Sequence, residues 1–172
     1  MLVSNDEDAL PRLAAQGDRR AFATLVRLHE ARVRGFLARL AGRQAADDLA
    51  QETFLRAWRH ASRFAGTGSY AAWLLAIAWR AFLDDQRRYR AERSGLSGVA
   101  VEPEDHHPDP AAKIDVDRLF ALLDPDERAC LALCLGQGWS YHEAAEILAI
   151  PLGTLKSRLS RATSKCRRML DQ

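Results

Sequence analysis

The sequence predicts an all-α protein of two small helical domains joined by a flexible linker, the second domain ending in a helix-turn-helix. Three observations carry this prediction. Apolar residues recur at intervals of three and four along most of the chain, and no convincing alternating strand pattern interrupts them. A stretch rich in proline, glycine and acids breaks the pattern near the middle. Close to the C-terminus, a short capped helix and a proline precede a strongly basic amphipathic helix.

The first domain, residues 10–93, is expected to contain three helices. Their apolar periodicity places them at residues 19–41, 45–63 and 69–93. The first of them has one apolar face, formed by Phe22, Leu25, Val26, Val33, Phe36, Leu37 and Leu40.

Residues 94–111 are expected to form a flexible acidic linker. The run from Ser94 to Pro110 holds three prolines, two glycines and four acids, a composition that favours an extended tether over a packed core. The alternative is a folded loop with a function of its own.

The second domain, residues 112–172, begins with a helix expected near residues 114–122. Asp124, followed by Pro125 and then by Glu127, predicts the capped start of a further helix that runs to about residue 135.

A helix-turn-helix is expected at the end of this domain. Ser140 and Glu143 have the spacing of a capping box, and Pro151 ends the helix that they start. The next helix has an apolar stripe, formed by Leu155, Leu159, Ala162, Cys166 and Met169. Between Gly153 and Arg168 it carries six Lys or Arg residues and no acid, which suits the major groove of DNA. The alternative is an ordinary surface helix with a solvated basic face.

One face of the second helix suits a basic protein partner. Asp48, Gln51, Glu52 and Leu55 fall within one arc of roughly 100°, at about 100° per residue. A polar face with an apolar centre is typical of protein interfaces, although it can equally be a solvated surface.

The third helix combines aromatic residues with a basic end. Aromatic side chains beside arginines suit unpaired DNA, because bases stack on the rings and phosphates bind the guanidinium groups. For Trp73 and Ile77 the alternative is an ordinary place in the core.

Composition excludes several classes of protein. The 172 residues carry a net charge of only +2, so nucleic-acid affinity has to come from local patches. We expect no membrane-spanning helix and no signal peptide, and the odd number of cysteines fits the reducing cytoplasm. No nucleophile motif or phosphate loop appears, so we expect no enzyme and no cofactor. The residues weighed as metal ligands, and set aside, are Cys130, Cys134, Cys166, His142 and the pair His106 and His107.

Two segments in the expected order resemble bacterial sigma factors of the extracytoplasmic-function (ECF) group. DDLAQETFLRAW, residues 47–58, resembles the segment that docks on the clamp helices of RNA polymerase. IPLGTLKSRLSRA, residues 150–162, resembles the helix that recognises the −35 promoter element. The stretch from Phe64 to Arg90 is similar to the segment that captures and opens the −10 element. Arg80 and Ala149 depart from the family, which usually has asparagine and glycine there.

The resemblance implies three sets of contact residues. Core polymerase would be bound by Asp48, Gln51, Glu52 and Leu55. The −10 DNA would be contacted by Phe64, Ser69, Tyr70, Trp79, Arg80, Arg87 and Arg88. On the last helix, the −35 bases would be met by Lys156, Ser157, Ser160 and Arg161, and phosphates would be held by Arg158 and Lys165.

The expected function is therefore that of a sigma factor, which binds core RNA polymerase and directs it to promoter DNA. An anti-sigma factor is the further partner that the resemblance implies. The main alternative is a free-standing helix-turn-helix regulator with an N-terminal sensor or dimerisation domain. An interaction protein that mimics a sigma factor is a third class, although such a protein would not need the basic recognition helix.

Overall fold

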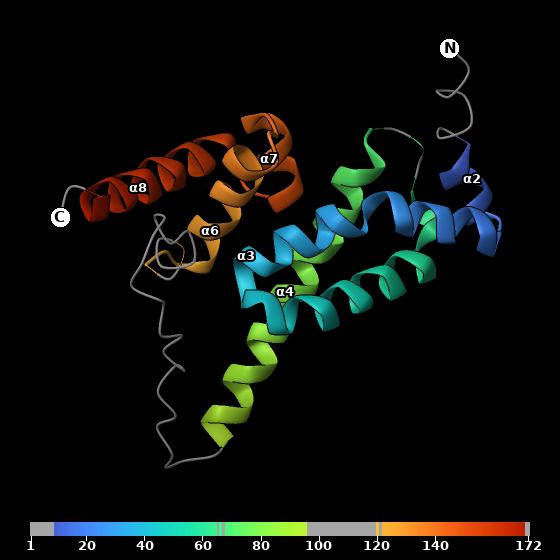
Figure 1. The fold of residues 1–172 in the computed structure, drawn as a ribbon, viewed down its shortest axis with the longest axis horizontal. Coiled ribbons are helices and arrows are strands. Elements are labelled where there is room, and N and C mark those ends of the chain that lie inside the picture. The colour runs from blue at the N-terminus through green and yellow to red at the C-terminus, as the bar shows by residue number, and fades with distance from the viewer. Residues whose placement is uncertain (1–8, 65, 67, 96–119, 121, 171–172) are drawn as a thin grey trace, which may run out of the picture.

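The computed structural model describes residues 9–64, 66, 68–95, 120 and 122–170 (Figure 1). The regular elements in these residues are all helical: α2 (Leu10–Ala15), α3 (Arg19–Arg59), the 3-10 turn η1 (Ala61–Arg63), α4 (Tyr70–Gly95), α6 (Pro125–Leu131), the π-helical turn η2 (Ala132–Gly136), α7 (Tyr141–Leu148) and α8 (Leu152–Leu170). The predicted all-α fold with a C-terminal helix-turn-helix is confirmed. Apart from residues 94, 95, 120 and 122, the predicted linker and the helix expected at 114–122 lie outside the described residues.

Helix α3 consists of two arms that fold back on each other. It begins at Asp18, whose carboxylate accepts hydrogen bonds from the backbone N–H groups of Arg20 and Ala21. The bend lies at Gly42, where φ is 80° and ψ is 164°, a conformation that essentially only glycine adopts. The two arms correspond to the two helices predicted at 19–41 and 45–63, and Figure 1 shows the second arm returning beside the first.

Helix α4 packs against α3 and completes the first domain. The side chains of Phe36, Leu74 and Phe82 are at most 1% exposed at the centre of this packing. Phe22 on the first arm of α3 meets Trp58 on the second, with ring centroids 4.9 Å apart. Apolar burial from distant parts of the sequence therefore holds the hairpin of α3 closed.

The second domain is built around α8, which packs on α6 and α7. The predicted apolar stripe forms this contact: Leu155 and Ala162 are 0% exposed and Leu159 is 7% exposed. Both predicted capping boxes are confirmed, at Asp124 with Glu127 and at Ser140 with Glu143.

The two domains touch each other. Helix α7 packs against α4, and α6 packs against α3. The Arg128 guanidinium donates a hydrogen bond to the carbonyl oxygen of Leu40, 3.2 Å away, close to the end of the first arm of α3. The Gln137 amide donates to the carbonyl oxygen of Arg32 at 2.8 Å, and the Arg32 guanidinium lies 5.7 Å from the ring centroid of Trp139. The chain is thus closed on itself in this structure.

Candidate functional site

A groove of about 720 Å³ runs between the two arms of α3. Its apolar lining includes Phe22, Val26, Phe54 and Trp58, which the fold of the hairpin brings together. Three of the residues predicted to bind polymerase also line it: Asp48, Gln51 and Leu55. The groove therefore combines an apolar floor with a polar edge.

The edge of this groove carries both signs of charge. Asp48 and Gln51 are exposed, and Leu55 is 45% exposed, a high value for a leucine. Across the groove, Arg34 lies 3.5 Å from Asp47, and both side chains remain more than half exposed. An exposed leucine between polar groups is suited to bind a partner that covers both.

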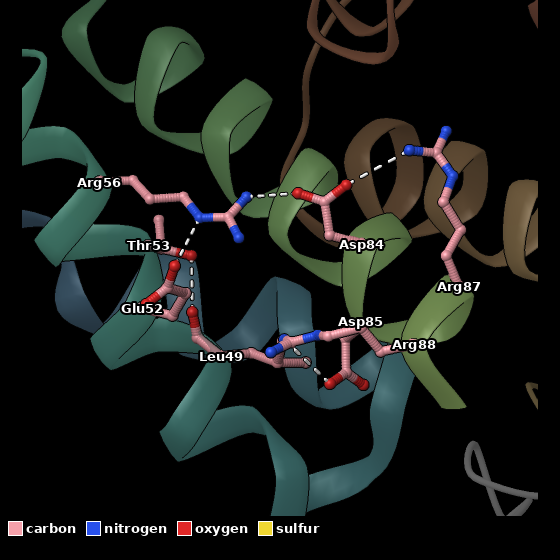
Figure 2. Close-up of polar contacts among 8 residues, drawn as sticks. All are labelled: Leu49, Glu52, Thr53, Arg56, Asp84, Asp85, Arg87 and Arg88. Carbon is pink, nitrogen blue, oxygen red and sulfur yellow. Dashed lines mark hydrogen bonds and ion pairs between the residues drawn. The ribbon is translucent and has the colours of Figure 1, made fainter. Parts of the chain in front are cut away.

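Glu52, the fourth predicted polymerase residue, does not line the groove. Its carboxylate accepts a hydrogen bond from Arg56 at 2.7 Å, and Arg56 also donates to Asp84 of α4 at 2.6 Å (Figure 2). These hydrogen bonds, to Glu52 first and then to Asp84, raise the pKa of Arg56. Glu52 therefore belongs to a network that ties the second arm of α3 to α4.

Two predicted −10 residues, Arg87 and Arg88, lie next to this network (Figure 2). Arg87 is 3.3 Å from Asp84 and Arg88 is 3.5 Å from Asp85, yet their side chains are 75% and 65% exposed. Exposed pairs of this kind are worth about 0–1 kcal/mol, so both arginines can exchange their partners for phosphates.

A second hollow of about 690 Å³ lies at the start of α4 and contains three predicted −10 residues, Phe64, Ser69 and Tyr70. Phe64, Tyr70 and Trp73 form an aromatic cluster with ring centroids 5.2–5.6 Å apart. Arg12 and His29, from α2 and α3, also line this hollow.

The hydroxyl of Tyr70 is buried in this hollow and has no hydrogen-bond partner among the described residues. Burial raises the pKa of Tyr70 to about 12. A buried hydroxyl without a partner is uncommon in folded proteins, because its desolvation is not repaid. The hollow thus has aromatic rings in its wall, and the Tyr70 hydroxyl would reach a ligand only if the side chains that cover it moved.

The other two predicted −10 residues lie elsewhere. Trp79 is only 5% exposed and stacks on Phe82 at 5.6 Å, so in this structure it is a core residue. Arg80 is exposed but does not line the hollow.

The helix-turn-helix turns at Ala149, which has φ of 54° and ψ of 45°. Ala149 is the residue that stands where the resembled family has glycine. The left-handed conformation costs an L-residue about 1–2 kcal/mol. The turn is closed by hydrogen bonds from the backbone N–H groups of Ala149 to the Glu146 carbonyl and of Ile150 to the Ala145 carbonyl. The Ser140 side chain, and then its backbone, donate to Glu143 and lower the pKa of that carboxyl.

Helix α8 presents four of its six predicted −35 residues to solvent: Lys156, Ser157, Ser160 and Arg161. The other two are bound within the domain. Arg158 lies 3.0 Å from the carboxylate of Asp126, and Lys165 lies 2.6 Å from that of Glu127. The exposed face of α8 therefore carries serines and cations, whereas the cations at its edge already have acidic partners.

The cysteines of the second domain sit in apolar surroundings. Cys130 and Cys134 are buried, and burial raises the pKa of both thiols, that of Cys130 to about 12. The described residues hold no cluster of three or more His, Cys, Asp or Glu side chains arranged to bind a metal ion. No helix in the described part of the chain is long and apolar enough to cross a membrane.

Sequence reasoning missed Phe22, Trp58, Arg12 and His29 as site residues. They come from α2 and from both arms of α3, and only the packed fold brings them beside the predicted residues. No local signal in the sequence could have identified them.

Residues 25–92 match the family Sigma-70 region 2, and residues 113–166 match Sigma-70, region 4. The chain is 34% identical over 167 residues to the ECF RNA polymerase sigma factor SigC of Mycobacterium tuberculosis (strain CDC 1551 / Oshkosh), covering 93% of this chain and 90% of SigC. It is 35% identical over 142 residues to the ECF RNA polymerase sigma factor EcfG of Rhodopseudomonas palustris (strain TIE-1), covering 80% and 78% of the two chains.

A solved structure with a similar fold is that of the sigma factor RpoE in complex with the anti-sigma factor NepR from Bartonella quintana. It has a TM-score of 0.76 and 29% sequence identity, and the match covers 87% of this chain and 96% of RpoE.

Proposed function

The chain belongs to the ECF group of RNA polymerase sigma factors, which direct the polymerase to promoters, and we propose that it divides this task among three surfaces. In this proposal the first domain, residues 10–93, binds core polymerase through the groove on α3 and captures the −10 element at the aromatic hollow. The second domain, residues 112–172, reads the −35 element with the exposed face of α8.

The groove on α3 is the single observation that carries the polymerase assignment. It is the apolar hollow lined by Asp48, Gln51 and Leu55, the residues that the resemblance marks for docking. Glu52 supports the groove from outside, because its carboxylate holds Arg56, which in turn holds α4. Burial of Leu55 by a partner would supply the apolar part of the binding energy, and the polar edge would supply orientation.

The −10 assignment is supported by the available groups of the second hollow. A base taken out of the DNA stack can stack on Phe64, which lines the hollow, at about 1–3 kcal/mol per base. The buried Tyr70 hydroxyl, which has no hydrogen-bond partner among the described residues, would donate to that base once the side chains that cover it moved. Arg80, Arg87 and Arg88, exposed along α4, would then hold the phosphates that follow.

The −35 assignment is supported by the chemistry of α8. Arg161 can donate two hydrogen bonds to a guanine, and the serines can donate to or accept from either base of a pair. Lys156 adds a cation beside them, and all four side chains point to solvent.

We also propose an anti-sigma factor as a partner, because RpoE of B. quintana is solved with one. The place of action is then the cytoplasm, where core polymerase meets the chromosome. Purification of the chain from its host without a stress stimulus should recover this protein; recovery of polymerase subunits alone in repeated preparations would argue against it.

The polymerase assignment can be tested by competition for core enzyme. The Gln51→Ala/Leu55→Ala double variant should bind core polymerase about tenfold or more weakly than the parent, because truncations at the centre of an interface commonly cost more than 1 kcal/mol. Leu13→Ala is the matched control, since Leu13 is 40% exposed but lines neither hollow. Equal competition by the double variant and the parent would remove the groove from the polymerase interface.

A further inference from the structure

Two ion pairs join the first turn of α6 to α8. Asp126 binds Arg158 at 3.0 Å, and Glu127 binds Lys165 at 2.6 Å. The two acids are neighbours in the sequence, whereas the two cations lie seven residues, or about two turns, apart on α8. One short segment therefore holds α8 at two points along its length.

In the second pair the Glu127 carboxylate is buried, whereas the Lys165 side chain is 37% exposed. The Glu127 side chain is only 1% exposed, and the oxygen that accepts from Lys165 also accepts from the backbone N–H of Asp124, 3.2 Å away. A buried carboxylate that loses its cation is strongly unfavourable, unlike an exposed one. Asp126 and Arg158 are 43% and 22% exposed, so they form the outer and weaker of the two pairs.

Arg158 and Lys165 lie between the apolar face of α8 and its solvent-exposed face. At about 100° per residue, Arg158 and Lys165 lie within about 20° of each other and about 80° from the centre of the apolar stripe. They lie on the opposite flank of that stripe from Lys156. The two ion pairs at this boundary therefore limit the rotation of α8 about its own axis.

We propose that Glu127 is a positioning residue for −35 readout, and that Lys165 and Arg158 set the rotation of α8 instead of binding phosphates. This inference rests on the proposed role of α8 in reading the −35 element. A roll of about 20° moves a side-chain tip about 6 Å from the axis by about 2 Å. Such a shift exceeds what a hydrogen bond to a base edge tolerates.

The ionic-strength dependence of promoter binding separates the two roles. A cation that replaces counterions on DNA contributes a slope of about one to the plot of log affinity against log salt, whereas a cation neutralised by a buried carboxylate does not. The measurement uses holoenzyme assembled from the full chain and core polymerase. The probe is a promoter fragment that the holoenzyme selects from duplexes randomised at the −35 position, together with its −35 point variants.

We expect Lys165→Gln to leave the salt slope unchanged and to reduce discrimination among the −35 variants about fivefold. Lys156→Gln is the matched control, an exposed lysine of the same helix, and should lower the slope by about one. Lys165→Arg keeps the pair and should keep the discrimination of the parent.

Glu127→Gln tests the same pair from its buried side. The glutamine retains an acceptor for the capping box, so the domain should still fold, as a thermal melt would verify. Discrimination should fall about fivefold, and the Glu127→Gln/Lys165→Gln double variant should be no worse than either single variant, because one interaction is lost in all three. The double variant leaves no unpaired buried charge, so it still tests the proposal if Lys165→Gln alone fails to fold.

Two results would overturn the inference: a slope lowered by Lys165→Gln as much as by Lys156→Gln, or losses that multiply in the double variant. Failure of the proposed function is distinguishable. In that case Lys156→Gln and Arg161→Ala would also leave both slope and discrimination at the parental values, which would remove α8 from −35 readout and this inference with it.

Discussion

The first domain places six of its proposed binding residues in two hollows, whereas the second places its exposed ones on the outer face of one helix. Each hollow needs side chains from elements far apart in the sequence, such as Phe22 and Trp58 on opposite arms of α3. The face of α8 needs only one continuous run of residues, held at the correct rotation. Function in the first domain therefore depends on how elements meet, and function in the second depends on how one element is oriented.

The largest expected effect is on the bend that forms the α3 groove. Gly42→Ala should lower the free energy of unfolding by about 3 kcal/mol, because its backbone conformation is essentially restricted to glycine. A Cβ at this position would meet nothing within 4 Å, so the cost would come from the backbone alone. Urea unfolding measures it.

Gly35→Ala provides the control on the same helix. Gly35 has an ordinary helical conformation, and a Cβ there would lie 3.6 Å from the flexible Arg39 side chain. This change should raise stability by about 0.5–1 kcal/mol. If both substitutions changed the free energy of unfolding equally, the backbone conformation at Gly42 would not be what the hairpin of α3 depends on.

The second prediction concerns the outer face of α8. Arg161→Ala should cost about 2 kcal/mol of discrimination at one or two −35 positions, with little change in stability, because the side chain is exposed. Transcription by holoenzyme from a set of −35 point variants measures it. A profile parallel to that of the parent would show that Arg161 does not read bases. The outer face of α8 would then no longer stand as the counterpart of the two hollows.

The third prediction concerns the turn that leads into α8. Ala149→Gly should raise the free energy of unfolding by about 1 kcal/mol, because glycine removes the cost of the left-handed conformation at φ of 54°. Chemical unfolding of the variant and the parent measures the difference. A loss of stability on this substitution would mean that the alanine methyl group contributes packing that outweighs the backbone strain.

The last prediction concerns the buried thiol of Cys130 and the buried hydroxyl of Tyr70, whose effect on stability at neutral pH is the smallest. Burial raises the pKa of Cys130 from 9.0 to about 12 and that of Tyr70 from 10.0 to about 12. In each case the unfolded state loses its proton first, so the stabilisation is complete below the unfolded pKa and is lost as the pH rises toward 12. The second domain should therefore begin to lose stability near pH 9 and the first near pH 10.

Unfolding curves between pH 8 and pH 11, followed separately for each domain, would measure this order. Cys130→Ala should remove the earlier decline and Tyr70→Phe the later one. A decline that persists unchanged in Cys130→Ala would assign it to other groups.

The elements that sequence alone predicted are those set by local rules. Capping residues identified the starts of α6 and α7, and periodicity identified the buried stripe of α8, including Leu155. The polar edge of the α3 groove was partly predicted in the same way, because Asp48, Gln51 and Leu55 share one side of a helix. Glu52 lies at the edge of the same arc, and its partner Arg56 draws it to α4, a contact across 28 residues from Arg56 to Asp84 that no local rule contains.

Two further predicted site residues have surroundings that the sequence did not indicate. Trp79 is buried in the core and stacks on Phe82 one turn further along α4, whereas Lys165 is bound by Glu127, 38 residues away in the sequence. The sequence also did not predict that Arg12 and His29 line the second hollow, because α2 and α3 come together there only in the packed domain.

The contacts of Arg128 with Leu40 and of Gln137 with Arg32 hold the two domains against each other in the free chain. A hydrogen bond of this kind is worth about 1 kcal/mol, so two of them shift a balanced equilibrium about 30-fold toward the closed form. Any ligand that needs the domains apart then binds with an apparent affinity reduced by the fraction of open chains. A partner that contacts both domains at once gains more binding energy to offset that cost than a ligand that contacts only one domain.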